Sequence, residues 1–334
     1  MMAGSTVGPT RDGDEPGRSE ASSGSASSGT SSGSVPSASF GTSSRSAAGV
    51  APSGAAAGYR PSRTLPFGAE FRRQASRRRT QLALGFMALL PLIILIAFQF
   101  GSGEEEPGRG EFGSLVSFAT SGGLNFTLFS LFVSASFLLV VVVALFCGDT
   151  VASEASWGSL RYLLAIPVPR ARLLAIKLLV ALTYSALALL LLAGTALLIG
   201  TLRYGWSPLR STVAAQLEPG EGLLRLLAVL GYLAVVLLVV AGLAFLLSVI
   251  TDAALGAVGG AVLLWILSSI LDQITALGAI RSFLPTHYST AWLGLLSTPV
   301  QTDNIVRGTI SAISYATIFW GLAFWRFTRK DVVS

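Results

Sequence analysis

Long apolar runs, each close to the length that crosses a lipid bilayer, constrain the fold of this 334-residue chain most strongly. An α-helix needs about 20 predominantly apolar residues to cross the hydrocarbon core. We expect spans at residues 82–100, 124–146, 173–200, 223–250, 253–277 and 308–327. The composition agrees, because 12% of the residues are charged, whereas soluble domains carry about 25%. The sequence therefore predicts an all-α integral membrane protein with about six transmembrane helices.

The first 64 residues differ from the rest of the chain, because Ser, Gly, Ala and Pro dominate them, as in ASSGSASSGTSSG at 21–33. Such a segment cannot bury enough apolar surface to offset its ordering entropy, so we expect a disordered cytoplasmic tail. It is either a regulatory or tethering arm or a dispensable extension. Residues 65–334 then form the transmembrane domain, and the first span acts as the insertion signal, since no apolar signal region precedes it.

An amphipathic segment, residues 65–81, stands directly before the first span. Phe67, Phe71 and Ala75 recur every four residues. The rest of the circumference carries Arg72, Arg73, Arg77, Arg78 and Arg79. This pattern predicts an interfacial helix whose arginines meet anionic lipid. The simpler alternative is a positively charged anchor on the cytoplasmic side.

Basic residues also predict the orientation in the membrane. With six spans, the five arginines, the basic residues of the loop 148–170 and the basic C-terminus all lie inside, while Glu104, Glu105 and Glu106 lie outside. Five or seven spans would move a basic cluster outside, against the usual asymmetry. We therefore expect a multi-pass protein of the cytoplasmic membrane with both termini cytoplasmic. The net charge of +6 sits beside apolar runs, so no nucleic-acid partner is expected.

The loop after the second span has a helical pattern of its own, which predicts a cytoplasmic helix over residues 153–166. An apolar stripe at i, i+3 and i+7 comprises Trp157, Leu160 and Leu164. A second face comprises Glu154, Gly158 and Arg161. Ser153 is the expected N-cap, and Pro167 and Pro169 end the helix.

The same loop resembles the permease subunit of ABC-2 type transporters. Those permeases carry a cytoplasmic Glu, then Gly-Ser/Thr-Leu after three residues, then Pro-x-Ser/Thr-Arg and a downstream Lys. The matching residues here are Glu154, Gly158, Ser159, Leu160, Pro167, Arg170 and Lys177, with Pro169 where Ser or Thr is commoner. The resemblance also covers the basic segment before the first span, LPTHYSTAW at 284–292, and the ending at 327–331.

The resemblance implies that the loop helix docks on a separate ABC ATP-binding subunit, which binds ATP and magnesium. This chain would then hold no cofactor itself, and it would pair with a second copy or a paralogous permease in the bilayer. The residues implied in ATPase coupling are Glu154, Trp157, Gly158, Ser159, Leu160 and Arg161. On the alternative reading, the two charges are solvated and Trp157 is an interfacial anchor.

Motifs for chemistry are missing from this sequence. It contains no G-x-x-x-x-G-K-[ST] and no H-E-x-x-H. Cys147 and His287 are the single Cys and the single His, which excludes an internal disulfide and a multi-histidine metal site. We therefore predict neither a catalytic residue nor a metal site, and a chain that is not an enzyme.

Four polar residues are candidates for a transport pathway. Asn125, Ser130 and Ser134 lie on the polar half of the second span, although Ser side chains also pack helices together. Asp272 lies near the end of the fifth span, where it either acts within the membrane or pairs with Arg281 at the interface.

Three functions remain open from the sequence. The leading one is an ATP-driven exporter subunit. An ion-coupled secondary transporter would need several buried ionisable residues, and a membrane enzyme would need convergent catalytic groups. The sequence does not indicate the substrate.

Overall fold

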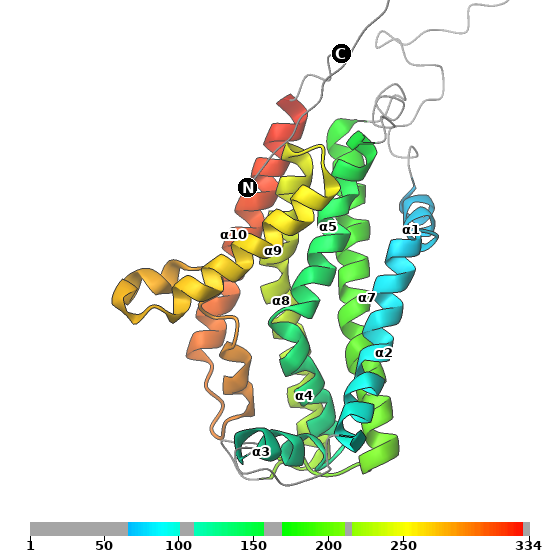
Figure 1. The fold of residues 1–334 in the computed structure, drawn as a ribbon. Helices are drawn as coiled ribbons and strands as arrows, with labels where there is room; N and C mark the ends of the chain where they lie inside the picture. The colour runs from blue at the N-terminus through cyan, green and yellow to red at the C-terminus, as the bar shows by residue number, and fades with distance from the viewer. Residues whose placement is uncertain (1–65, 101–109, 157–168, 211–215, 330–334) are drawn as a thin grey trace, which may run out of the picture. The chain divides into compact units, whose positions relative to one another are not determined.

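The computed structural model of the chain describes residues 66–100, 110–156, 169–210 and 216–329 (Figure 1). The predicted tail lies outside these ranges. The described residues form α-helices, short 3-10 helices and one isolated β-bridge between Leu209 and Leu217. The α-helices are α1 (Phe67–Ala75), α2 (Arg78–Phe100), α3 (Gly110–Ala119), α4 (Gly123–Ala135), α5 (Leu138–Ser156), α7 (Arg170–Tyr204), α8 (Pro219–Ile250), α9 (Ala254–Gln273) and α10 (Asp303–Arg329). The 3-10 helices are η2 (Thr275–Phe283) and η3 (Ala291–Leu296).

The predicted membrane class is confirmed by the length and hydropathy of these helices. Among the described residues, α2, α7, α8, α9 and α10 are each long and apolar enough to cross a membrane, which gives 5 spans. The pair α4 and α5 passes the same test together and raises the number to 6. The chain is thus an all-α, multi-pass membrane protein.

The second span differs from the prediction in two ways. It is not one helix over 124–146, because α4 and α5 meet at a bend of 58° around Ser136 and Phe137 (Figure 1). In addition, α5 continues to Ser156, so the segment predicted as a loop from Gly148 begins as helix.

Buried hydrogen bonds explain this continuation of α5. The backbone N–H groups of Val151 and Ala152 donate to the Ser248 hydroxyl of α8 at 3.0 and 2.9 Å. The Thr150 hydroxyl donates to the Phe146 carbonyl at 2.6 Å. Since Ser248 of α8 and the backbone of α5 itself accept these bonds, the segment can stay helical and buried, although its sequence is polar.

Other boundaries shift for local reasons. The fifth span ends at Gln273 rather than at 277, and the 3-10 helix η2 follows it. Gly278 within η2 has φ of 53°, a left-handed conformation that glycine adopts without a Cβ penalty. The segment between the first two spans, expected as a short loop, contains α3. Pro91 lies inside the continuous helix α2.

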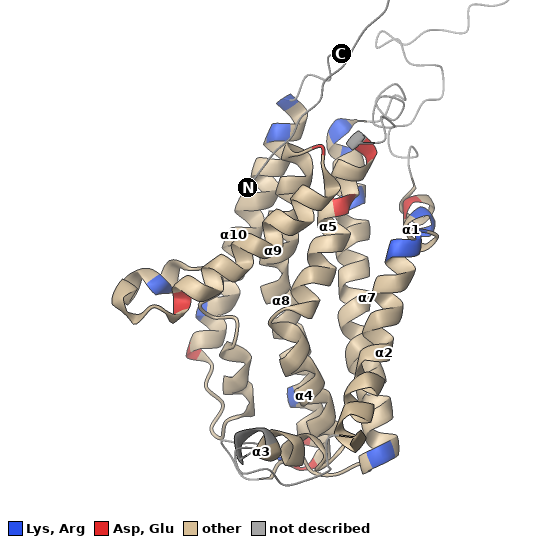
Figure 2. Ribbon diagram, viewed as in Figure 1, with Lys and Arg blue, Asp and Glu red and all other residues tan. Residues whose placement is uncertain are grey.

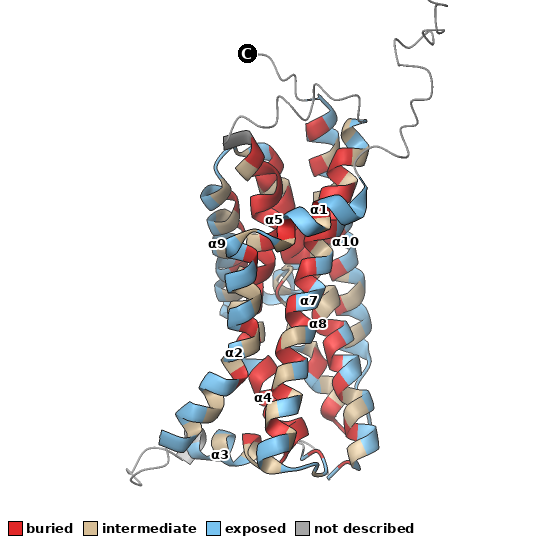
Figure 3. Cartoon of the chain, turned by 90° about the vertical axis from the view of Figure 1, so that its right-hand side faces the viewer, coloured by how far each residue is buried: buried red, intermediate tan, exposed pale blue. Residues whose placement is uncertain are grey.

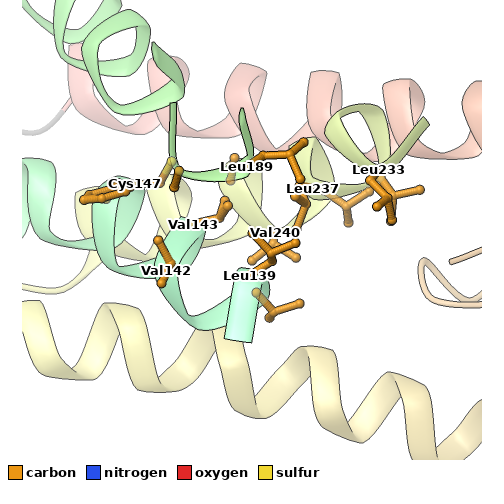
Figure 4. Packing of buried hydrophobic residues seen from close by; sticks show 14 of the residues in the cluster. Leu139, Val142, Val143, Cys147, Leu189, Leu233, Leu237 and Val240 are labelled. Atoms are coloured by element: carbon orange, nitrogen blue, oxygen red, sulfur yellow. The ribbon is translucent and has the colours of Figure 1, made fainter. Parts of the chain in front are cut away.

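The core lies around α7 and α8, whose most apolar windows are 61% and 67% buried, whereas that of α2 is 11% buried (Figure 3). A helix that is apolar on all sides is expected to be surrounded by protein or lipid. On one side of α8, Leu139 and Val143 of α5 lie close to Leu237 and Val240 of α8 (Figure 4). On another, a Cβ at Gly242 would lie 3.3 Å from the Cα of Ala316, so this glycine permits the close approach of α10.

Candidate functional site

The most unusual feature of the described helices is a buried ion pair between α5 and α7. The Lys177 ammonium lies 2.6 Å from the Glu154 carboxylate, and each side chain is 2% exposed. Lys177 also lies 3.0 Å from Glu70 of α1. Lys177 lies on the buried face of α7, while Glu154 lies at the last turns of α5, so one ammonium joins three helices. A charge buried this deeply requires partners, because its desolvation is costly.

Arginines of the segment before the first span complete the cluster. Arg73 of α1 donates to Glu154 at 2.9 Å. Arg77 and Arg79 donate to the two oxygens of Asp149 on α5, at 3.1 and 3.0 Å. We refer to Glu70, Arg73, Arg77, Arg79, Asp149, Glu154 and Lys177 as the Glu154 cluster. Figure 2 shows acidic segments of α5 near basic segments of α1 and α7, at the end where α10 finishes.

Apolar and hydrogen-bonding contacts hold α1 against α7 beside these charges. The Phe71 ring stacks on Tyr184 with centroids 4.8 Å apart. The Tyr184 hydroxyl donates to the Phe71 carbonyl at 2.9 Å. Burial raises the pKa of Glu70, but Lys177, with help from Arg73 and Arg77, outweighs it, so the pKa lies below its ordinary value of 4.5. Glu70 is therefore a carboxylate at neutral pH.

The structure corrects the expected position of Glu154. Glu154 was predicted on a cytoplasmic helix over 153–166 that docks on a partner, whereas it lies buried within α5. Ser153 is not an N-cap, since its hydroxyl donates to the Asp149 carbonyl inside α5 at 2.5 Å. The remaining predicted coupling residues lie outside the described residues: Trp157, Gly158, Ser159, Leu160 and Arg161.

The five predicted interfacial arginines divide into two groups. Arg73, Arg77 and Arg79 pair with carboxylates of the protein itself. The sequence pattern did not predict these ion pairs. Arg72 and Arg78 are exposed. The amphipathic helix itself is present as α1, and a break at Ser76 and Arg77 separates it from α2. Contact of these arginines with lipid remains a prediction.

The predicted pathway residues of α4 are buried and already hydrogen-bonded. The Asn125 amide bonds to the backbone of Arg210 in both directions, at 2.8 and 3.0 Å. The hydroxyls of Ser130 and Ser134 donate to the carbonyls four residues earlier, Phe126 and Ser130, at 2.8 and 2.6 Å. The two hydroxyl bonds lie within α4, and a role of the three residues in a transport pathway stays a prediction.

A cavity of about 410 Å³ lies beside the bend between α4 and α5 instead. Aromatic side chains of three elements line it, namely Phe132, Trp265 and Trp292. Its polar lining includes Ser136, Ser269 and Gln273. The sequence pattern did not single out these residues, because they come together only through the bend.

Asp272 belongs to a second group of charges, at the end of α9. Its Oδ1 lies 2.6 Å from His287 Nδ1 and 3.6 Å from Arg281 Nε. The predicted proximity to Arg281 is confirmed, whereas the pairing with His287 was not predicted. We call these three residues the Asp272 cluster. Within the described residues, no group of three or more His, Cys, Asp or Glu side chains could hold a metal ion.

Sequence reasoning missed the central position of Lys177, although a signal was present. The residue interrupts the apolar run LLAIKLLVAL at the start of the third span. An ionisable residue inside such a run is a functional candidate by default and needs a named partner. The acidic partners Glu70 and Asp149 gave no comparable signal, because both lie in polar stretches of sequence.

Residues 92–333 match the family described as "Protein of unknown function (DUF2705)". The match spans most of the chain, from the second half of α2 to the end of α10, and the chain belongs to this family. No curated protein matches the sequence. Asp149, Glu154 and Lys177 lie inside the matched range, whereas the α1 residues of the Glu154 cluster precede it.

Proposed function

We propose that this chain is the membrane subunit of an ATP-driven exporter of the ABC-2 type, working with a separate ATP-binding subunit. The chain itself would hold no nucleotide and perform no hydrolysis. A second permease chain, identical or paralogous, would complete the transporter. The membrane would be the cytoplasmic membrane, with both termini inside, in keeping with the basic starts of α2 and α7 and the basic end of α10.

The Glu154 cluster is the observation that carries this proposal. Residues 157–168, which contain the predicted docking residues, lie between α5 and α7 in the sequence. The Glu154–Lys177 pair joins these two helices, and Arg73 and Glu70 add α1 to the same joint. A displacement imposed on residues 157–168 by a partner would therefore move α5, α7 and α1 together, a rigid-body response suited to alternating access.

The bend between α4 and α5 supports the same mechanism. A break of two residues inside a span gives a place where α5 could turn against α4 without unfolding either helix. The cavity of about 410 Å³ adjoins this bend. Motion of α5 would change the cavity walls at Ser136 and Leu139. A movement that the ATP-binding subunit imposes on α5 would thus change the shape of this cavity, which is large enough for a small ligand.

The test measures ATPase coupling in a complex purified from the native membrane. The tagged chain is purified with its copurifying proteins, and ATP hydrolysis by the complex is measured in reconstituted vesicles. Arg161 lies on the predicted docking face. We expect that the Arg161→Glu variant no longer copurifies with the ATP-binding subunit and that its rate of ATP hydrolysis falls at least tenfold. The matched control is Arg203→Glu at the other end of α7, which we expect to change neither.

A Glu154→Lys variant is a poor test of docking. It would place a second ammonium beside Lys177 in a buried site, and loss of function would then report misfolding. Export that survives ATP depletion but stops when the proton gradient collapses would replace the proposal with an ion-coupled secondary transporter. Catalytic turnover of a membrane substrate without any partner would favour an enzyme.

A further inference from the structure

A cleft of about 560 Å³ opens at the turn between α1 and α2. Its walls come from this turn and from the last turns of α5. The lining residues are Arg73, Ser76, Arg77, Arg78, Arg79, Asp149, Ser153 and Glu154. Five residues of the Glu154 cluster are in this lining, and Ser76 and Arg78 in the turn are exposed.

The cleft carries an excess of positive charge. Its lining has four arginines and two carboxylates, those of Asp149 and Glu154. Lys177, which is not part of the lining, pairs with both Glu154 and Glu70. Arg73 and Arg79 stay 46% and 66% exposed while bound to these carboxylates. Each guanidinium has five N–H donors, so donors remain for a ligand with several acceptor oxygens.

The first turn of α2 also favours an anion in the cleft. The 23-residue helix begins at Arg78, so the N–H groups of its first turn have no acceptor within the helix. The positive end of the helix dipole faces the turn that borders the cleft. A tetrahedral phosphate ester matches both the guanidinium forks and such a helix start.

An exposed apolar stripe runs along α2 away from the cleft. Leu82, Phe86, Leu89 and Ile93 follow the spacing i, i+4, i+7 and i+11, which places them on one face with Arg78. Their exposed fractions are 72%, 44%, 48% and 42%. From Leu82 to Ile93 the stripe rises about 16 Å at 1.5 Å per residue, about the depth of one leaflet.

We propose that the cleft binds the phosphate of an anionic glycerophospholipid, whose acyl chains lie along the apolar stripe of α2. The stripe decides between a lipid and a free phosphate ion, because only a lipid uses both features. Bound phosphate would accept hydrogen bonds from Arg77 and Arg79, which also pair with Asp149. The lipid bound in the cleft would therefore affect the ion pairs at the end of α5. The site does not depend on the proposed exporter function.

The experiment titrates the delipidated full-length chain in a neutral detergent with phosphatidylglycerol, phosphatidylcholine or inorganic phosphate. Native mass spectrometry counts bound molecules, and thermal unfolding reports their stabilising effect. We expect one saturable phosphatidylglycerol per chain and no saturable phosphatidylcholine. The Arg78→Gln/Arg79→Gln variant should weaken binding roughly 10- to 30-fold, given the attraction of two basic residues at a membrane surface.

Two controls separate a discrete site from general attraction. Arg78→Gln alone leaves the Arg77 and Arg79 pairs with Asp149 intact, and it should still weaken binding severalfold without loss of folding. Arg326→Gln/Arg329→Gln removes two arginines from the last turn of α10 and should have little effect. Equal weakening by both double variants would overturn the site in favour of diffuse electrostatics.

Two further outcomes would also overturn the proposal. Equal stabilisation by inorganic phosphate and by phosphatidylglycerol would reduce the site to a free-anion site. Absence of any saturable lipid, together with loss of a detergent-stable dimer in Phe86→Arg, would assign the stripe to a second copy of the chain.

Discussion

The Glu154 cluster and the Asp272 cluster both bring charges together at helix ends, but their surroundings differ. Glu154 and Lys177 are each 2% exposed and connect α5 to α7, with α1 joined through Glu70. Asp272 and His287 are 17% and 28% exposed and connect α9 to the turn that follows η2. If one partner is lost at Asp272, water can solvate the other, whereas the buried Glu154 would then depend on Arg73.

The difference in burial between the two clusters determines how each one contributes to the structure. A buried ion pair is weak evidence of net stability, because desolvation offsets the attraction between the charges. It does enforce one arrangement, since any displacement leaves a charge buried without its partner. The Glu154 cluster is therefore suited to fixing three helices relative to one another, while the Asp272 cluster is suited to a local attachment.

The largest effect is expected from Lys177→Met. The substitution removes the ammonium that Glu70 and Glu154 share and leaves them the half-exposed Arg73 as a cationic partner. Breaking a buried pair costs about 3–5 kcal/mol. Unfolding in detergent micelles by heat or by a denaturing detergent measures the loss. The triple variant Glu70→Gln/Glu154→Gln/Lys177→Met, which buries no uncompensated charge there, should recover part of it. A triple variant as unstable as the single one would contradict this account.

A smaller effect is expected from Tyr184→Phe, which removes the hydroxyl that binds the Phe71 carbonyl and keeps the stacked ring. The loss of one such hydrogen bond costs about 0.5–1.5 kcal/mol. Hydrogen exchange should accelerate in α1 while the core of α8 remains protected.

Tyr232→Phe is the matched control near the Asp272 cluster, because its hydroxyl bonds to the residue that follows His287. Its hydroxyl donates to the Tyr288 carbonyl at 2.6 Å, so exchange should accelerate near Tyr288 and not in α1. If both variants loosened both regions, the two clusters would not be independent.

A still smaller effect is expected from Asp272→Asn. Partly exposed pairs contribute about 0–1 kcal/mol, and the amide can still accept a hydrogen bond from His287. Global unfolding should change little, while hydrogen exchange should rise over residues 284–290. Destabilisation as large as that of Lys177→Met would show that the Asp272 cluster is structurally equivalent to the Glu154 cluster.

Apolar periodicity and basic flanks were sufficient to predict the membrane class and most of the spans. Residues 223–250 lie within α8, and 308–327 lie within α10. These predictions succeed because bilayer thickness fixes the length of a span and the flanking charges mark its ends. The bend at Ser136 and Phe137 had no comparable signal, because both residues occur readily inside apolar helices.

The site was harder to predict, because its charges are satisfied through long-range contacts. Glu154 lies in a polar stretch and was expected on a docking face at the cytoplasmic surface. It is instead buried, with Lys177 and Arg73, distant in sequence, as its partners. The local sequence pattern around Glu154 does not indicate which distant residues will contact it in the fold. The cavity near Trp265 and Trp292 depends in the same way on the packing of several elements.

The smallest expected effect concerns the dependence of α1 docking on pH. Because the folded state lowers the pKa of Glu70 below 4.5, its stabilising contribution is fully present above about pH 4.5. The contribution is lost as the pH falls through the lowered value. A spin label at Gly68→Cys, an exposed position of α1, reports the mobility of this helix, while the native Cys147 is buried. We expect constant mobility from pH 7 to pH 5 and a rise below pH 4.5. Glu70→Gln should show higher mobility throughout and a weaker rise, and an unchanged pH profile in that variant would assign the acid response to another carboxylate.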